Sequence, residues 1–299
     1  MKFGAGLWCA SARWGRSSVS AVKTIEFSSP SLSSRESTVR VDLLEKDPNR
    51  VPRVCWNVAG ERFYSTDALH CYAELEYNVA RTAIYSKPGL DRRLSLCSPE
   101  HLAPVFLVWP ELRFDVHATE IPMMDGSALP FFHALRRIAG VPQAIRFYDA
   151  PLEHSWELPR GYVKVSPSDT FEVEYEITRP DGFSSAASLS VYSAEDLYSV
   201  FSARTFIFKD DYDAARAAGL LGGVDESCGM LLGTESRVVY RMDEEPARHK
   251  ILDLLGDIAF ACPALPKLRI QVLNGGHTIH HKIMEKLLPY VSTGNPQEI

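Results

Sequence analysis

The sequence RHKILDLLGD, at residues 248–257, predicts the helix around which both halves of the chain are organised. At about 100° per residue, a helix places Asp253 about 40° and Asp257 about 80° round from His249. The three polar side chains therefore share one face, and the leucines and isoleucine point mostly elsewhere. An imidazole and a carboxylate one turn apart can bind one divalent ion, as two histidines do in H-E-x-x-H helices. The alternative is an ordinary His/Asp pair on a helix surface, which needs no ion.

Residues outside this helix can complete such a site. His101 would be a third ligand beside His249 and Asp253, which leaves one coordination position open for water. Glu100, its neighbour, would then lie within reach of that water. A carboxylate there can take the proton as the water attacks a carbonyl group.

His277 follows a pair of glycines at the start of a predicted helix. As an imidazolium it would stabilise an oxyanion and protonate a leaving amine, and Asp257 would orient it. The neighbouring His280 and His281 are interpreted as residues of the helix surface rather than as part of a metal cluster.

The composition predicts a folded protein of two domains, because 299 residues exceed one typical domain. A hydrophobic content of 45% with 23% charged residues is ordinary for a globular protein. The net charge of −6 and pI near 5.9 argue against a nucleic-acid partner, since phosphate contacts need clustered Lys and Arg. The six cysteines are scattered without C-x-x-C spacing, which is typical of a reducing compartment.

The N-terminal residues have no clear periodicity. Residues 1–20 are interpreted as a loose extension, although their basic, serine-containing composition is weakly similar to that of a transit peptide. No apolar run approaches the roughly 18 residues of a membrane span, so no transmembrane segment is predicted. The expected location is the cytoplasm.

In the first half, short strands surround two predicted helices. Ser98 and Pro99 predict a helix start, with Ser98 as N-cap, and Pro104 predicts an irregularity soon after it. Ser127 is predicted to cap the second helix and Gly140 to end it. Strands, recognised by alternating apolar residues, are expected at residues 24–27, 38–43, 54–58 and 112–116.

The second half repeats this order of elements. Turn residues at 179–182 predict a hairpin, and Ser193 predicts the cap of a helix. Strands are expected at residues 171–177, 189–191, 238–240 and 268–272. The pattern predicts an α+β fold of two similar domains, each a β-sheet layered with helices, and the active site between them. The expected domains are residues 21–146 and 147–299.

Several blocks of the sequence closely resemble the zinc-dependent UDP-3-O-acyl-N-acetylglucosamine deacetylases of the lipid A pathway. In order, they are EHL at 100–102, EIPMMDGSA at 120–128, ARTFIF at 203–208, GG at 222–223, RHKILDLLGD at 248–257 and GH at 276–277. The resemblance runs from about residue 25 to residue 288. It implies hydrolysis of the N-acetyl group of a UDP-linked acylated amino sugar, with release of acetate. It also implies one catalytic Zn²⁺, for which Fe²⁺ is the alternative.

The resemblance also implies a role for each matching residue. Thr205 would hold the attacked carbonyl or its oxyanion, Phe206 would pack against the sugar, and Lys250 would face its polar or diphosphate side. The resemblance implies an insert near residues 209–240 of the second domain that forms a hydrophobic passage for the acyl chain, and Leu220 and Met230 lie in the corresponding stretch. The implied set is His101, His249 and Asp253 for metal binding; Glu100, His277, Asp257 and Thr205 for catalysis; and Lys250, Phe206, Leu220 and Met230 for substrate binding.

The chain departs from the family's pattern mainly in its first half. The family's early G-x-G-L-H-[ST]-G block is replaced around residues 30–34, and its A-L-x-G-L-G-I-D-N block is replaced at residues 105–110. Two alternatives therefore stay open: a diverged deacetylase of another acylated amino sugar or nucleotide sugar, and a non-catalytic binding homologue. A monomer is expected.

Overall fold

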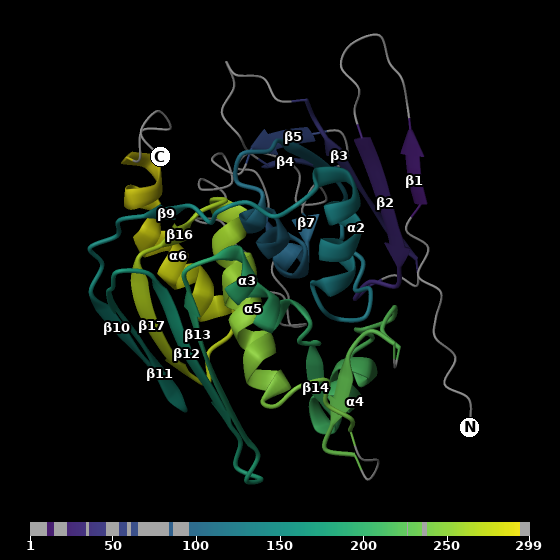
Figure 1. Ribbon diagram of the computed structural model, residues 1–299. Coiled ribbons are helices and arrows are strands. Elements are labelled where there is room, and N and C mark those ends of the chain that lie inside the picture. Colours follow the sequence, from purple (N-terminus) through teal and green to yellow (C-terminus); the bar gives the residue numbers. More distant parts are fainter. Residues whose placement is uncertain are drawn as a thin grey trace.

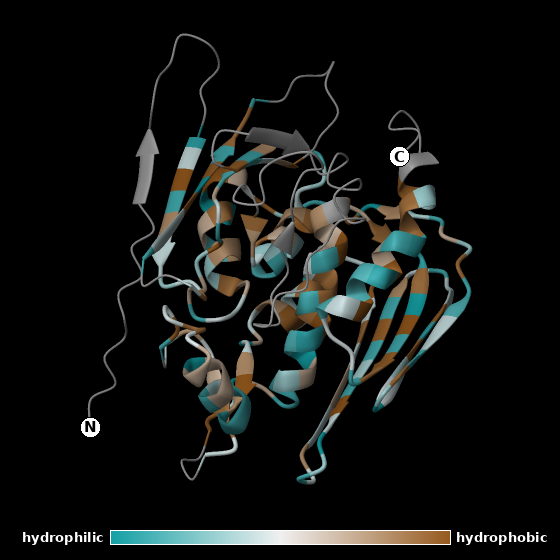
Figure 2. Cartoon of the chain, turned by 180° about the vertical axis from the view of Figure 1, so that it is seen from behind, coloured by the Kyte–Doolittle hydropathy of each residue, from teal (hydrophilic) through white to brown (hydrophobic). Residues whose placement is uncertain are grey.

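A computed structural model describes residues 11–14, 23–33, 36–45, 54–58, 61–64, 84–85, 96–225, 227–234 and 238–293 of the chain. It confirms the predicted α+β class: two β-sheets lie on opposite sides of a group of helices (Figure 1). Strands of both sheets alternate between hydrophobic and hydrophilic residues, as Figure 2 shows by colour. Each sheet can therefore turn one apolar face towards the helices.

The first sheet has six strands and is formed by the first half of the chain. Alternation along two of its strands buries Ile25 and Phe27 on one and Val39 and Val41 on the next, with at most 1% of each residue exposed. Its strands, in spatial order, are β1 (Ser11–Trp14), β2 (Lys23–Ser29), β3 (Ser37–Leu43), β8 (Phe114–His117), β4 (Val54–Val58) and β5 (Glu61–Tyr64). Neighbours are antiparallel except β4 and β8, which are parallel.

Strand β1 corrects the prediction for the N-terminus. Residues 11–14 were expected to be loose, but they pair antiparallel with β2, with Ser11 opposite Glu26. A pairing partner 15 residues along the chain, rather than local periodicity, makes this segment a strand. The rest of the predicted extension lies outside the described residues.

The second sheet has five strands and confirms the hairpin predicted around residues 179–182. Its strands, in spatial order, are β10 (His154–Leu158), β11 (Gly161–Pro167), β17 (Leu268–Leu273), β12 (Phe171–Thr178) and β13 (Ser184–Val191). The parallel pair of β12 and β17 brings the last strand of the chain into the middle of the sheet. The strand predicted at residues 238–240 is wrong: these residues have no strand partner, and Val239 is exposed.

Five α-helices lie in the part of the chain that the structure describes: α2 (Leu129–Ala139), α3 (Ala194–Phe201), α4 (Lys209–Ala217), α5 (Glu245–Ala261) and α6 (His277–Thr293). Helix α3 begins as predicted, because Ser193 and Asp196 form a reciprocal capping box. Gly140 ends α2 with a positive φ. The N-cap position of α2 is Ala128 rather than the predicted Ser127. The Ser127 hydroxyl still accepts the N–H of Leu129 over 3.4 Å while it donates to the Asp125 carboxylate.

Helix α5 is the central element of the molecule. It contacts α3, α6, β12 and β13 on one side and the segment of residues 99–108 on the other. Ile251, Leu252, Leu254 and Leu255 are completely buried in these contacts. The predicted central role of this stretch is therefore confirmed.

The segment of residues 99–108 is not the α-helix that Ser98 and Pro99 predicted. It forms two 3₁₀ helices, η3 (Pro99–His101) and η4 (Ala103–Val108), and Ser98 has a left-handed backbone and makes no side-chain cap. Pro104 lacks the N–H that a continuous α-helix would use, so the irregularity predicted there is confirmed. The segment is buried throughout.

The described residues also form three short two-stranded sheets: β14 (Phe206–Phe208) with β15 (Met230–Leu232), β16 (Leu265–Pro266) with β9 (Phe147–Tyr148), and β6 (Ile84–Tyr85) with β7 (Leu96–Cys97). Buried residues of both large sheets belong to one contiguous hydrophobic core. The division into domains at residues 146 and 147 stays a prediction. Within the residues that the structure describes, no helix combines the length and apolar character that crossing a bilayer requires.

Candidate active site

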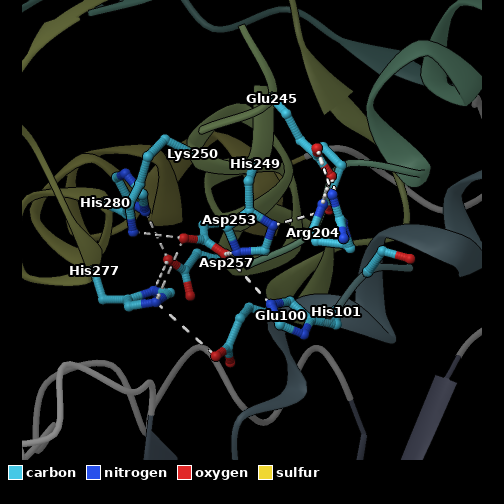
Figure 3. A network of polar contacts seen from close by, with 12 residues as sticks. Glu100, His101, Arg204, Glu245, His249, Lys250, Asp253, Asp257, His277 and His280 are labelled. Atoms are coloured by element: carbon cyan, nitrogen blue, oxygen red, sulfur yellow. Dashed lines mark hydrogen bonds and ion pairs between the residues drawn. The ribbon is translucent and has the colours of Figure 1, made fainter. Parts of the chain in front are cut away.

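Helix α5 places its three predicted site residues on a buried face. His249, Asp253 and Asp257 are 1%, 2% and 0% exposed, so the surface-pair alternative is wrong for this helix. The remaining site residues come from η3, from the segment before β14, and from the start of α6 (Figure 3).

His101 lies opposite His249 across the Asp253 carboxylate, and all three side chains are buried. Oδ1 of Asp253 lies 3.1 Å from Nε2 of His249 and 3.7 Å from Nε2 of His101. One donor atom from each of the three residues falls within 4.8 Å of the others. The structure thus brings together the three residues predicted to bind metal.

The chemistry of these three side chains fits a divalent metal ion. Nδ1 of His249 lies 3.0 Å from the carbonyl oxygen of Ala203, so this nitrogen carries the proton. In a neutral ring the lone pair is then on Nε2, a buried atom that lies 3.1 Å from Oδ1 of Asp253 and makes no well-aligned hydrogen bond to the described residues. Such a backbone contact, which fixes the tautomer and the ring, is typical of metal-binding histidines. Two imidazoles and a carboxylate are a common donor set for zinc.

Asp253 is held in its ionised form. Burial raises the pKa of its carboxyl group, but His249 and Lys250 lower that pKa by a larger amount. The net pKa therefore lies well below the usual range. Nζ of Lys250 contributes a hydrogen bond of 2.8 Å to Oδ2. The carboxylate can therefore act as an anionic ligand without first losing a proton.

Glu100 lies beside the metal-binding group, on η3. Burial raises the pKa of its carboxyl group, and the nearby His277 and His101 lower it by less. Its Oε2 is buried and has no hydrogen-bond partner among the described residues. A carboxylate with a raised pKa and a free oxygen is suited to accept a proton.

His277 begins α6 and faces the same space. Its Nδ1 donates to Oδ2 of Asp257 over 2.7 Å, and its Nε2 lies 4.0 Å from both Oε1 of Glu100 and Oδ2 of Asp253. Burial lowers the pKa of His277, but the Asp257 carboxylate raises it more, and the net pKa is about 9. The imidazole is therefore protonated at neutral pH and can donate from Nε2.

His280 and His281 correct the sequence interpretation, which placed them on the helix surface. They are 0% and 2% exposed, and both face Asp257. Their positions three and four residues after His277 put them on the same side of α6. This spacing was the available signal, but only the packing of α6 against α5 shows that the side is buried.

Thr205 lies directly before β14, in a tightly packed loop. Its backbone N–H donates to the carbonyl oxygen of Gly126 over 2.6 Å, and its own carbonyl accepts from the N–H of Met230 over 2.8 Å. Added Cβ atoms at Gly126 and Gly229 would lie 2.9 and 2.8 Å from Cγ2 of Thr205. Side chains at either glycine would therefore displace the threonine.

Arg204 fixes this loop to the beginning of α5. Its guanidinium binds Glu245 through two hydrogen bonds, Nε to Oε1 at 2.8 Å and Nη2 to Oε2 at 3.0 Å. Its backbone N–H also donates to Oε1, at 3.0 Å, and Glu245 is fully buried. This pair positions both Ala203, which holds His249, and Thr205.

The residues predicted to bind substrate are only partly brought together. The ring of Phe206 lies 6.3 Å from that of His249, and the Lys250 ammonium lies 5.8 Å from the Phe206 ring. Met230 belongs to a small apolar cluster that Phe206 also contacts. Leu220 lies after α4, half-buried and outside that cluster.

Comparison of the sequence with known proteins finds one family, in both a family model and individual relatives. A family model described as LpxC, UDP-3-O-acyl N-acetylglycosamine deacetylase, matches residues 58–289. The UDP-3-O-acyl-N-acetylglucosamine deacetylase of Syntrophotalea carbinolica is 28% identical over 238 residues, which cover 77% of this chain and 74% of that protein. The protein of the same name from Aquifex aeolicus is 29% identical over 196 residues, 63% of this chain and 68% of its own length. A Synechocystis protein of that name is 27% identical over 188 residues, 59% and 67% of the two chains.

Proposed function

Because this chain belongs to the UDP-3-O-acyl N-acetylglycosamine deacetylase family, we propose that it hydrolyses the N-acetyl group of UDP-3-O-acyl-N-acetylglucosamine. The products are acetate and the free amine, and the reaction belongs to lipid A biosynthesis. One observation carries the proposal: a buried His-His-Asp group lies beside both a carboxylate with one oxygen unbonded among the described residues and a protonated histidine.

We propose His101, His249 and Asp253 as the residues that hold the metal of this metal-dependent family, with Zn²⁺ as the ion and Fe²⁺ as the alternative. When bound, the ion supplies Lewis-acid activation of a water molecule and of the amide carbonyl. The three side chains define its place at the junction of η3 and α5.

Glu100 is proposed as the general base. Its raised pKa makes the carboxylate a better proton acceptor than an exposed glutamate, and its free Oε2 leaves room for the hydrogen of a water molecule. After accepting the proton, the acid stays buried close to His277, which is the group proposed to protonate the leaving amine.

His277 is proposed as the electrophilic partner and general acid. Its Nε2–H would stabilise the oxyanion that forms on the amide carbonyl and then protonate the amine. Asp257 holds Nδ1–H, so the ring cannot turn away and its positive charge is balanced. Thr205, fixed between Gly126 and Met230, is proposed as a further donor to the oxyanion.

The substrate is proposed to extend away from this centre in two directions. Phe206 and Lys250 lie next to His249, where they would pack against the sugar and face its diphosphate. Met230 is proposed to contact the acyl chain, because it shares an apolar cluster with Phe206. Leu220, which lies outside that cluster, is proposed for the same role on the family resemblance alone. We further propose that the protein acts as a cytoplasmic monomer.

A diverged deacetylase, acting on a different acylated amino sugar, is the second candidate. The segment around residues 30–34, where the family's early block is replaced, contacts the glycine pair at 222–223, which lies between the proposed acyl-chain residues Leu220 and Met230. The N–H of Gly223 donates to the carbonyl oxygen of Leu32 over 3.4 Å. A change in this segment can therefore alter which acyl group is accepted.

The decisive experiment measures acetate release from the UDP-linked, 3-O-acylated sugar, with and without a chelator, for the wild type and Glu100→Ala. We expect the chelator to abolish turnover, and the substitution to lower it by orders of magnitude while metal binding survives. Unchanged turnover of Glu100→Ala would remove the assigned base. Preference for an N-acetyl sugar without the 3-O-acyl chain would favour the second candidate, and one metal per chain without any deacetylation would indicate a binding homologue.

A further inference from the structure

Asp257 is shared by two histidines of α6, although the proposed reaction uses only one of them. Its Oδ2 lies 2.7 Å from Nδ1 of His277 and 2.9 Å from Nδ1 of His280 (Figure 3). The carboxyl group is ionised, because His277 and His281 lower its pKa by more than burial raises it. A carboxylate oxygen can only accept, so both Nδ1 atoms carry protons and donate.

The second nitrogen of His280 extends this set of hydrogen bonds into the sheet. Its Nε2 lies 3.1 Å from the hydroxyl of Tyr175 on β12, and both side chains are almost completely buried. Since Nδ1 of His280 donates, the neutral ring accepts at Nε2, and the phenol is the donor. Burial agrees with this assignment: it lowers the pKa of His280 to about 4 and raises that of Tyr175 well above its usual value.

The chain of hydrogen bonds therefore has one direction throughout: Tyr175 donates to His280, and His280 and His277 both donate to Asp257. It ties together β12, α6 and α5. Tyr175 and His277, at the two ends of this set of hydrogen bonds, have little freedom to move. An added Cβ at Gly275 would lie 2.9 Å from the Tyr175 hydroxyl, so the phenol sits against the turn from which His277 emerges.

We propose that Tyr175 and His280 are positioning residues for the deacetylation, which hold the Asp257 carboxylate at the angle that aims Nε2 of His277 at the reacting amide. The proposal rests on the proposed function above. Neither residue makes a hydrogen bond to the His101–His249–Asp253 group among the described contacts. They act on His277 through Asp257, and His280 also through its ring contact with His277, at 5.6 Å between centroids.

A second ion is the competing interpretation of the same residues, because donor atoms of Asp257, His277 and His280 also lie within 4.8 Å of one another. Protons on both Nδ1 atoms argue against it, since a metal ligand must offer a lone pair. Metal analysis of the purified protein separates the two interpretations. Two ions per chain, one of them lost in a His280 variant, would overturn the positioning role.

The kinetic test compares two substitutions of His280. His280→Leu removes both nitrogens at similar size, whereas His280→Asn keeps an N–H near the position of Nδ1 and loses the reach to Tyr175. We expect His280→Leu to lower kcat by about 10- to 100-fold with KM and metal content unchanged, as for other residues that orient a catalytic group. His280→Asn should recover much of this loss, and Tyr175→Phe should cost less than His280→Leu. Met284→Leu, a buried change on the same helix, is the packing control.

A spectroscopic readout keeps the test independent of turnover. The Nδ1 proton of His277, hydrogen-bonded to a buried carboxylate, should give a downfield resonance in ¹⁵N-histidine-labelled protein, with or without metal. His280→Leu should shift that resonance, and Met284→Leu should not. An unmoved resonance with unchanged kcat, or equal losses in the Leu and Asn variants, would refute the positioning role. A wild type without deacetylase activity would refute the proposed function instead, and the resonance would still report on the hydrogen bonds.

Discussion

The backbone of Glu100 rests directly on Gly256 of α5: a Cβ atom added to the glycine would lie 2.0 Å from the Glu100 carbonyl oxygen. A contact this short leaves no room for any other residue at position 256. The glycine is thus the reason that the proposed base can lie against the helix that carries two of the proposed metal ligands.

Gly256→Ala should therefore displace Glu100 and reduce both stability and turnover. Overpacking of this kind costs about 1–3 kcal/mol of unfolding free energy. Urea denaturation and kcat measurement on the same preparations would show the two effects. Gly222→Ala is a matched control for stability, because the added Cβ meets only one atom, at 3.5 Å. Equal stability and kcat in Gly256→Ala and the wild type would mean that η3 and α5 can separate without consequence.

Metal binding should stabilise the folded protein by mass action. With free Zn²⁺ at 100 times its dissociation constant, the unfolding free energy should rise by about 2.7 kcal/mol. Asp253→Ala and His101→Ala should lose this increment, and Glu100→Gln should keep it. Thermal denaturation at several zinc concentrations measures it. An increment that survives in Asp253→Ala would place the ion elsewhere.

The ion pair of Arg204 and Glu245 should make stability depend on pH. Burial raises the pKa of Glu245, but the hydrogen bonds from Arg204 and Arg241 lower it by a larger amount. The folded-state pKa is therefore below the usual value. The unfolded chain then binds more protons in this range, and stability falls as pH falls below the unfolded pKa, about 4.3. Between about pH 5 and pH 3, the wild type should lose more unfolding free energy than Glu245→Gln.

Removing one partner of the same pair tests its strength at neutral pH. Arg204→Met leaves the buried Glu245 carboxylate without its two guanidinium hydrogen bonds, which should cost about 3–5 kcal/mol. Chemical denaturation at pH 7 measures the loss. The control is Lys209→Met, which removes the exposed ion pair of Lys209 and Asp213. It should change the unfolding free energy by less than about 1 kcal/mol. Similar small losses in both variants would contradict an anchoring role for Arg204.

Lys250→Met should weaken binding of the UDP-linked substrate more than it slows the chemical step. Loss of one charge-assisted contact to the diphosphate would raise KM by about tenfold, equivalent to about 1.4 kcal/mol. A substrate analogue without the diphosphate is the control and should be affected much less. Because Lys250 also contacts Asp253, metal content must be measured in the variant. Equal losses with both substrates would assign the lysine to the metal site alone.

The sequence alone was most informative about α5. The helical period placed His249, Asp253 and Asp257 on one face, and the packed structure buries that face. The local conformation around Glu100 and His101 was predicted less well: the cap signal of Ser98 and Pro99 is common to α and 3₁₀ helices, and the burial of the segment decides between them. Glu100 and His101 were predicted to belong to the site from motif similarity rather than from periodicity.

Interactions between distant segments explain the remaining errors. His280 and His281 look like surface residues because nothing within α6 indicates that Asp257 of α5 faces them. Residues 11–14 become a strand because β2 offers an edge, whereas residues 238–240 pair with no strand among the described residues. A period of 2 or 3.6 describes one element, whereas burial and pairing depend on its neighbours.

The buried contact between the segment of residues 99–108 and α5 also limits how halves of this enzyme can be exchanged with those of relatives. Its proposed base and first ligand enter from one half of the sequence, and the other ligands from a helix of the other half. Fragments cut between the sheets would each expose an apolar surface and carry an incomplete site. A chimera that exchanges the first half for that of a relative must therefore carry a surface that still fits Gly256, or the grafted half will fold without delivering Glu100 to its place.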